Sequence, residues 1–111
     1  MNVCVPVTTE GDVSRGFGRA HRVAVATVVD GQMTGWQEFD VGWDTLHDEA
    51  TEGAHHARIA RFVNDHQIDA VVAANMGDGM RRMLTTMKVA IAVGADGDAR
   101  SAVLKARLPA H

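Results

Sequence analysis

The chain has 111 residues, of which 46% are apolar and 23% are charged, and its net charge is −3. These values are typical of one globular domain over residues 1–111, with no room for a second core, and they exclude global disorder. The lack of a basic excess argues against nucleic acid as a partner.

We expect a cytoplasmic protein that does not enter a membrane. No apolar run approaches the roughly 20 residues that a membrane helix requires. The N-terminal residues lack the positive segment of a signal peptide. Cys4 is the single cysteine, so no intrachain disulfide can form, which fits a reducing compartment.

The chain opens with a short strand and a long loop. Valines alternate with Cys4 and Pro6 through residues 2–7, a β-branched run that predicts a strand buried on both faces. Residues 8–19 contain several glycines and small polar side chains, and they predict a loop.

A β-hairpin follows this loop. Residues 21–29 and 33–41 predict its two strands, because the Asp30-Gly31 pair between them suits a type I′ turn. Residues 42–52 are polar and acidic without a clear period, so they predict a surface loop.

The second half of the chain alternates helices with short apolar strands. Residues 53–66 and 78–86 carry apolar side chains at helical spacing, and residues 98–108 predict a last helix. Residues 68–74 and 89–93 read as buried parallel strands. The order predicts an α/β domain with a five-stranded mixed sheet and helices on its faces.

A ligand site is expected at one rim of this sheet. Ligands of open α/β sheets gather outside the carboxyl ends of the strands. Residues 8–19, 75–79 and 94–97 each leave a strand through glycine, so we expect the three loops to form one pocket rich in backbone N–H groups. Asp78 and Asp98 are expected N-caps of helices whose N-termini add partial positive charge.

The first loop carries candidate ligand contacts. Arg15 and Arg19 beside flexible glycines suit an anionic ligand, and Phe17 could cover an apolar or polarisable face of it. The alternative is that Phe17 plugs the end of the core while both arginines are solvated.

His55 and His56 begin the first long helix. A helix N-terminus disfavours imidazolium, so the rings should stay neutral, which is the form that binds metals. Adjacent helical residues point about 100° apart, so the pair cannot easily chelate one ion, although one ring could supply a single bond to a cluster. The alternative is that one ring caps the helix and the other faces water.

Sulfur-containing side chains offer one further candidate. Met76 lies in the glycine-rich loop and could approach a ligand, since thioethers suit soft metals. Met80, Met83 and Met87 have helical spacing and should pack in the core. Cys4, inside the first strand, is expected to be an inert buried thiol.

Three segments resemble those of a known family. Residues 13–20 resemble its Ser-x-x-Phe-Gly-Arg-Ala loop, residues 53–57 the start of its first helix, and residues 68–79 its valine-aspartate-alanine-valine segment with a glycine-rich loop. Over nearly its whole length the chain resembles the dinitrogenase iron–molybdenum cofactor biosynthesis family. The doubled histidine is a departure from the family pattern.

The resemblance implies a ribonuclease-H-like sheet and a non-enzymatic protein that binds, carries or inserts iron–sulfur precursors of the nitrogenase cofactor. The cargo would be an iron–sulfur or iron–molybdenum-type cluster or another anionic ligand, exchanged with donor or acceptor proteins. The residues that the resemblance assigns to the pocket are Ser14, Phe17, Gly18, Arg19, His55, Asn75 and Gly77. Reasoning from residue types adds His56 and Met76.

The residue types also bear on two other functions, an enzyme and a regulatory or protein-interaction module. A magnesium-dependent nuclease needs an acid on the first strand, and residues 2–7 contain none; no Gly-x-Ser-x-Gly motif occurs either, so we expect no enzyme. A regulatory or protein-interaction module with a vestigial pocket would use residues 42–52 and the edge of the strand at 33–41 as surfaces. Monomer and homodimer both remain open.

Overall fold

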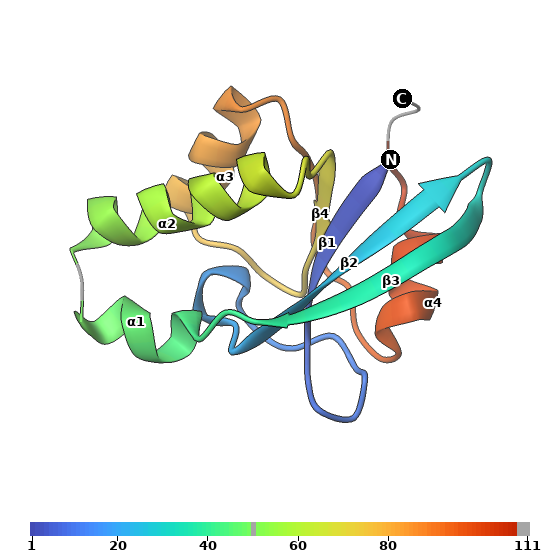
Figure 1. Cartoon of the computed structure of the whole chain (residues 1–111), viewed down its shortest axis with the longest axis horizontal. Helices are drawn as coiled ribbons and strands as arrows, with labels where there is room; N and C mark the ends of the chain where they lie inside the picture. Colours follow the sequence, from blue (N-terminus) through green and yellow to red (C-terminus); the bar gives the residue numbers. More distant parts are fainter. Residues whose placement is uncertain (50, 109–111) are drawn as a thin grey trace.

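The central strand β1 joins an antiparallel half of the sheet to a parallel half. Within the described residues the sheet has five strands in the order β3-β2-β1-β4-β5, and β1 pairs antiparallel with β2 and parallel with β4. The computed structural model describes residues 1–49 and 51–108 (Figure 1). Its strands are β1 (Asn2–Val7), β2 (Arg22–Val29), β3 (Gln32–Asp40), β4 (Ala70–Val72) and β5 (Ala90–Ala92).

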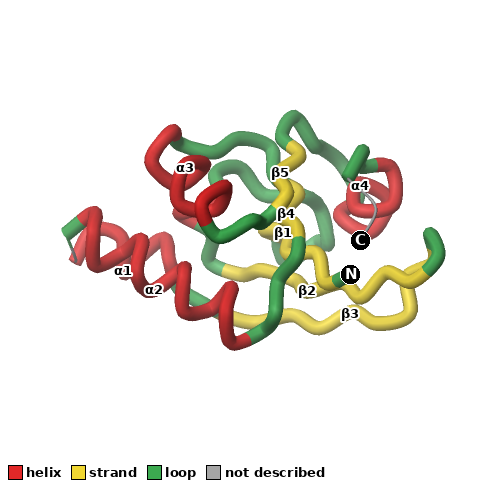
Figure 2. The backbone as a smooth tube through the Cα atoms, turned by 90° about the horizontal axis from the view of Figure 1, so that it is seen from above, coloured by secondary structure: helices red, strands yellow, loops and turns green. Residues whose placement is uncertain are grey.

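The helices are divided unequally between the two faces of the sheet. Helices α1, α2 and α3 lie on one face and α4 on the other (Figure 2). Right-handed crossovers explain why α2 and α3 share a face, because α2 links β3 to β4 and α3 links β4 to β5, and these three strands run in the same direction. The bounds are η1 (Phe17–Arg19, a 3₁₀ turn), α1 (Trp43–Glu49), α2 (Glu52–Asp65), α3 (Asp78–Thr86) and α4 (Ala99–Lys105).

Most of the predicted elements are confirmed, with ends shifted by a residue or two. The hairpin turn has positive φ at both central residues, 51° at Asp30 and 76° at Gly31, as a type I′ turn requires. Helix α3 ends at Thr86 as predicted, whereas α4 ends at Lys105, short of the predicted end at residue 108, because the backbone of Ala106 is extended. The strand order is compatible with the implied ribonuclease-H-like arrangement.

The prediction of a surface loop over residues 42–52 is wrong for most of its described part. Trp43 begins α1 and its side chain is only 2% exposed. Its ring makes edge contacts with Phe17 and Phe62, with both centroid distances 5.5 Å. One buried anchor gives no visible helical period, but its packing stabilises a short helix that would be marginal alone. Thr51 is the N-cap of α2, and residue 50 lies outside the described residues.

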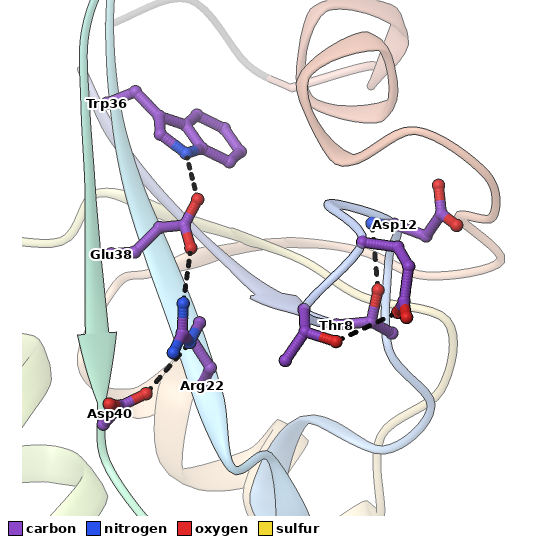
Figure 3. Close-up of polar contacts among 8 residues, drawn as sticks. Thr8, Asp12, Arg22, Trp36, Glu38 and Asp40 are labelled. Carbon is purple, nitrogen blue, oxygen red and sulfur yellow. Dashed lines mark hydrogen bonds and ion pairs between the residues drawn. The ribbon is translucent and has the colours of Figure 1, made fainter.

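A polar row stabilises the exposed margin of β2 and β3 on the α4 face (Figure 3). The indole N–H of Trp36 donates to Glu38 at 2.9 Å, and the guanidinium of Arg22 donates to Glu38 at 3.2 Å and to Asp40 at 2.9 Å. Arg100 of α4 stacks over the Trp36 ring, with its guanidinium carbon 4.6 Å from the ring centroid. Trp36 therefore connects the sheet to α4.

None of the helices in the described residues is both long enough and apolar enough to cross a membrane.

Candidate functional site

A pocket of about 460 Å³ opens beyond the carboxyl ends of β1 and β4, on the face that carries α2 and α3. Residues 16–19 of the first loop line one side, and residues 75–80, from the loop after β4 into α3, line another. Glu52, His55 and His56 of the first turns of α2 complete the wall. Two loops distant in sequence thus meet at this end of the sheet.

Of the nine residues that the family resemblance and the residue types assign to the pocket, all except Ser14 line it. The backbone N–H of Ser14 donates to the carbonyl of Pro6 at 2.9 Å, so Ser14 belongs to the base of the loop. Arg19 lines the pocket and is exposed, but Arg15, its neighbour in the loop, does not line it. The structure therefore separates the two arginines that the sequence grouped together.

Close backbone approaches hold the two loops together. Gly16 forms a parallel bridge with Asn75, and the N–H of Phe17 donates to the Asn75 carbonyl at 3.4 Å. A Cβ on Gly16 would lie 3.3 Å from the Asn75 side-chain oxygen, and one on Gly18 would lie 3.2 Å from the Met80 methyl carbon. The glycines of the first loop allow this tight packing.

Phe17 is a core residue, which is the second of the two roles that the sequence left open for it. Its side chain is fully buried and its ring packs at 72° to the ring of Trp43. The ring closes the end of the core behind the pocket, so it is not exposed to cover a ligand.

His55 is buried, with 2% exposure, and both of its ring nitrogens have partners. Nε2 lies 2.6 Å from the Gly18 carbonyl oxygen, and Nδ1 lies 3.1 Å from a guanidinium nitrogen of Arg58. A carbonyl can only accept and a guanidinium can only donate, so these partners require a neutral ring protonated at Nε2. A metal at either nitrogen would have to displace Gly18 or Arg58.

His56 has different surroundings. It is half-buried, and its Nε2 lies 3.9 Å from a carboxylate oxygen of Glu52. A Cβ on Gly79 would lie 3.0 Å from its Cε1, so the ring rests against the first turn of α3. The two histidines therefore contact different parts of the pocket wall.

The N-terminus of α3 faces the pocket without a side-chain cap. Gly77 occupies the N-cap position and makes no capping hydrogen bond, so the prediction that Asp78 is the N-cap is wrong: Asp78 is the first helical residue. By contrast, Thr51 caps α2, and Asp98 caps α4 as predicted. The first N–H groups of a helix have no partner within it, so at α3 they are suited to bind an anion.

The pocket also contains two carboxylates, one of which sequence reasoning missed. Glu52 and Asp78 line it together with Arg19. Glu52 was missed because it was assigned to a surface loop, although Thr51 accepts a hydrogen bond from the N–H of Ala54, as N-caps do. An anion would meet a cation and helix N–H groups in this pocket, but Asp78 lies in the first turn of that same helix, α3, and Glu52 in the first turn of α2.

The expected convergence of three loops on one pocket is only partly correct. Residues 94–97 line a second hollow, of about 620 Å³, with α4 on the opposite face of the sheet. The first loop reaches both hollows, because the N–H of Val13 donates to the Gly97 carbonyl at 2.8 Å. The loops share one end of the sheet, but the sheet itself divides the space between them.

No group of three or more His, Cys, Asp or Glu side chains that could hold a metal ion occurs within residues 1–49 and 51–108. Cys4 is fully buried, and this burial raises the pKa of its thiol. The thiol therefore stays protonated, and a protonated thiol is a poor nucleophile and metal ligand.

The sequence and the fold both match known proteins. A family model described as dinitrogenase iron-molybdenum cofactor matches residues 1–108. None of the curated proteins gives a significant match.

Three solved structures share the fold. PH0822 has 16% identity and a TM-score of 0.75, with 98% of this chain and 96% of that chain covered. MJ0327 of Methanocaldococcus jannaschii, provisionally described as a dinitrogenase, has 10% identity and a TM-score of 0.66, with 100% and 96% covered. TM1290 of Thermotoga, provisionally described as a NifB protein, has 17% identity and a TM-score of 0.67, with 92% and 83% covered.

Proposed function

The chain belongs to the dinitrogenase iron–molybdenum cofactor family, and from this membership we propose that it binds and carries an iron–sulfur or iron–molybdenum-type cluster, or a precursor of one, without catalysing a reaction. The observation that supports this most strongly is the pocket itself. It brings Arg19, the glycine-rich loop after β4 and the uncapped N-terminus of α3 to one place.

These groups suit an anionic cargo. The N–H groups at the start of α3 have no side-chain cap within the described residues, and the helix dipole adds partial positive charge there. Arg19 is exposed at the pocket, so its guanidinium can approach a bound cluster without losing an internal partner in the core. Glu52 and Asp78 also line the pocket, and their negative charge opposes this positive potential.

Soft donors in the wall would supply bonds to the metal. His56 and Met76 both line the pocket; imidazole suits iron, and thioether sulfur suits soft metals and iron–sulfur clusters. Ligation by His55 remains part of the prediction from sequence, but it would require the loss of one of two hydrogen bonds. We propose His56, with Met76, as the candidate ligands.

A carrier must receive its cargo and pass it on. We therefore propose cluster donor or acceptor proteins as partners, in the cytoplasm, and contact at the rim formed by Arg19 and the first turn of α3.

Anaerobic reconstitution of the full chain with iron and sulfide tests this function. We expect visible absorption that stays with the protein on desalting, reduced several-fold in Arg19→Gln and in the double variant His55→Ala/His56→Ala. Arg15→Gln is the matched control, because Arg15 is an exposed arginine of the same loop outside the pocket. Failure of the wild type to bind, or equal binding by all variants, would exclude the proposal.

One observation favours a second candidate function. Strand β3 lies at the edge of the sheet over nine residues and, in the described chain, pairs only with β2. Such an edge can pair with a partner strand. A chain that binds no cluster but forms a dimer in light scattering would point to a protein-interaction module.

A further inference from the structure

We propose that His55 is a positioning residue that holds the Arg19-bearing turn against α2, and that it is not a ligand to the cargo. The first test of this inference, which measures the binding of cargo, rests on the proposed function; the second test, by NMR, does not. It separates the roles of two adjacent histidines, both of which line the pocket.

The contact with Gly18 is the shortest one that holds this turn. Gly18 is the middle residue of η1, and its carbonyl lies 2.6 Å from Nε2 of His55, across 37 positions of sequence. The backbone bonds of the same turn are longer: the N–H of Phe17 reaches Asn75 at 3.4 Å, and that of Ala20 reaches Phe17 at 3.3 Å. Loss of the imidazole would therefore weaken the placement of Gly18 and, next to it, of Arg19.

Arg58 fixes the form of the ring that makes this contact. It lies one turn further along α2 and donates to Nδ1 at 3.1 Å. With Nδ1 accepting, the proton must be on Nε2, which is the nitrogen that faces Gly18. Arg58 and Gly18 together thus select one tautomer and one orientation of a buried ring.

Coordination of a metal by His55 would be costly. The ring is 2% exposed, so ligation at Nε2 would leave the Gly18 carbonyl without its imidazole donor. A buried polar group that loses its partner loses the full benefit of that bond. We call the contact of His55 with the Gly18 carbonyl the clasp. His56 lies on the same helix but against Gly79, so a ligand could contact it without breaking the clasp.

The variants His55→Gln and His55→Ala distinguish a clasp from a ligand. A glutamine amide donates through its nitrogen and accepts through its oxygen, so it can replace both hydrogen bonds, but it is a poor ligand for a soft metal. We expect reconstituted His55→Gln to bind cargo within about two-fold of the wild type, and His55→Ala to bind at least about five-fold more weakly, as expected for one lost buried hydrogen bond. If His55→Gln folds but loses the cargo as fully as His55→Ala, the imidazole is a ligand and the clasp is excluded.

A second measurement is independent of cargo. Nitrogen-15 NMR of the wild type should show a neutral His55 ring protonated at Nε2, and the amide signals of Gly18 and Arg19 should shift further in His55→Ala than in His55→Gln. Protonation at Nδ1, or unchanged Gly18 and Arg19 signals in His55→Ala, would overturn the clasp. If His55→Ala fails to fold, the tautomer of the wild type and the cargo binding of His55→Gln still distinguish a positioning residue from a ligand. If the wild type binds no cluster but shows this NMR pattern, the proposed function is excluded and the positioning role of His55 still stands.

Discussion

The two faces of the sheet are built from side chains of different size. The face under α1–α3 is filled by large aromatic and aliphatic groups, among them Phe17, Trp43 and Leu84. The face under α4 is packed mainly by valine and alanine from strands and helix. The seven-residue helix α4 covers the face with small side chains, and the pocket described above lies on the face with the large ones.

The exposed surface follows the same division. The large hydrophobic residues that are exposed in the described chain are Val29, Val93 and Leu104, and each lines a hollow beside α4. On the α2 and α3 face, the pocket is lined by charged groups, histidines and glycines together with Met76 and the buried side chains of Phe17 and Met80. The pocket that we propose as the site therefore lies on the face whose core contains the larger side chains.

The largest expected effect is a test of this difference in packing. Trp43→Ala removes a buried ring that touches Phe17 and Phe62, and we expect it to lower the free energy of unfolding by about 3–5 kcal/mol. Leu104→Ala, at a residue 51% exposed on α4, should change it by less than about 0.5 kcal/mol. Urea denaturation measures both; similar losses would show that the two faces do not differ as described.

A smaller effect on stability is expected from adding a side-chain cap at the N-terminus of α3, which faces the pocket. Gly77→Ser should cap α3 as Asp98 caps α4, and we expect it to raise the free energy of unfolding by a few tenths of a kcal/mol, about the difference between glycine and serine at an N-cap. The new hydroxyl would occupy the N–H groups proposed to hold the cargo, so binding should fall several-fold while stability rises.

Gly53→Ser is the matched control for this substitution. Gly53 lies in the first turns of α2, has open space around it and does not line the pocket. It should gain stability because glycine is unfavourable in a helix, without a change in binding. Unchanged binding in Gly77→Ser would show that the α3 N-terminus does not contact the cargo.

The smallest effect concerns pH on the opposite face. The hydrogen bond from the Trp36 indole, opposed by partial desolvation and aided by Arg22, holds the pKa of Glu38 below its usual value. A lowered pKa stabilises the fold above the unfolded-state value of about 4.3, and this contribution is lost as the pH falls through the folded-state pKa. We expect Glu38→Gln to reduce the loss of stability between about pH 5 and pH 3. The same slope in Glu38→Gln and wild type, measured by urea denaturation, would contradict this.

The sequence determined the local elements of this protein. Alternating valines, the Asp30-Gly31 turn and the helical stripe through Met80 and Leu84 each reflect backbone geometry within a few residues, so the strands, the hairpin and α3 were predictable. The meeting of Arg19 with the loop after β4 was also predictable, because both follow strands that run in the same direction.

Only the tertiary structure decided how those elements share space. It placed residues 94–97 on the far side of the sheet, gave α1 its anchor at Trp43, turned His55 inward to Gly18 and left Gly77 without a cap. Each outcome depends on contacts between segments distant in the chain, and a pattern within a short stretch of sequence carries no information about what will pack against it. Residue types therefore predicted where the candidate pocket lies, and packing decided which side chains line it.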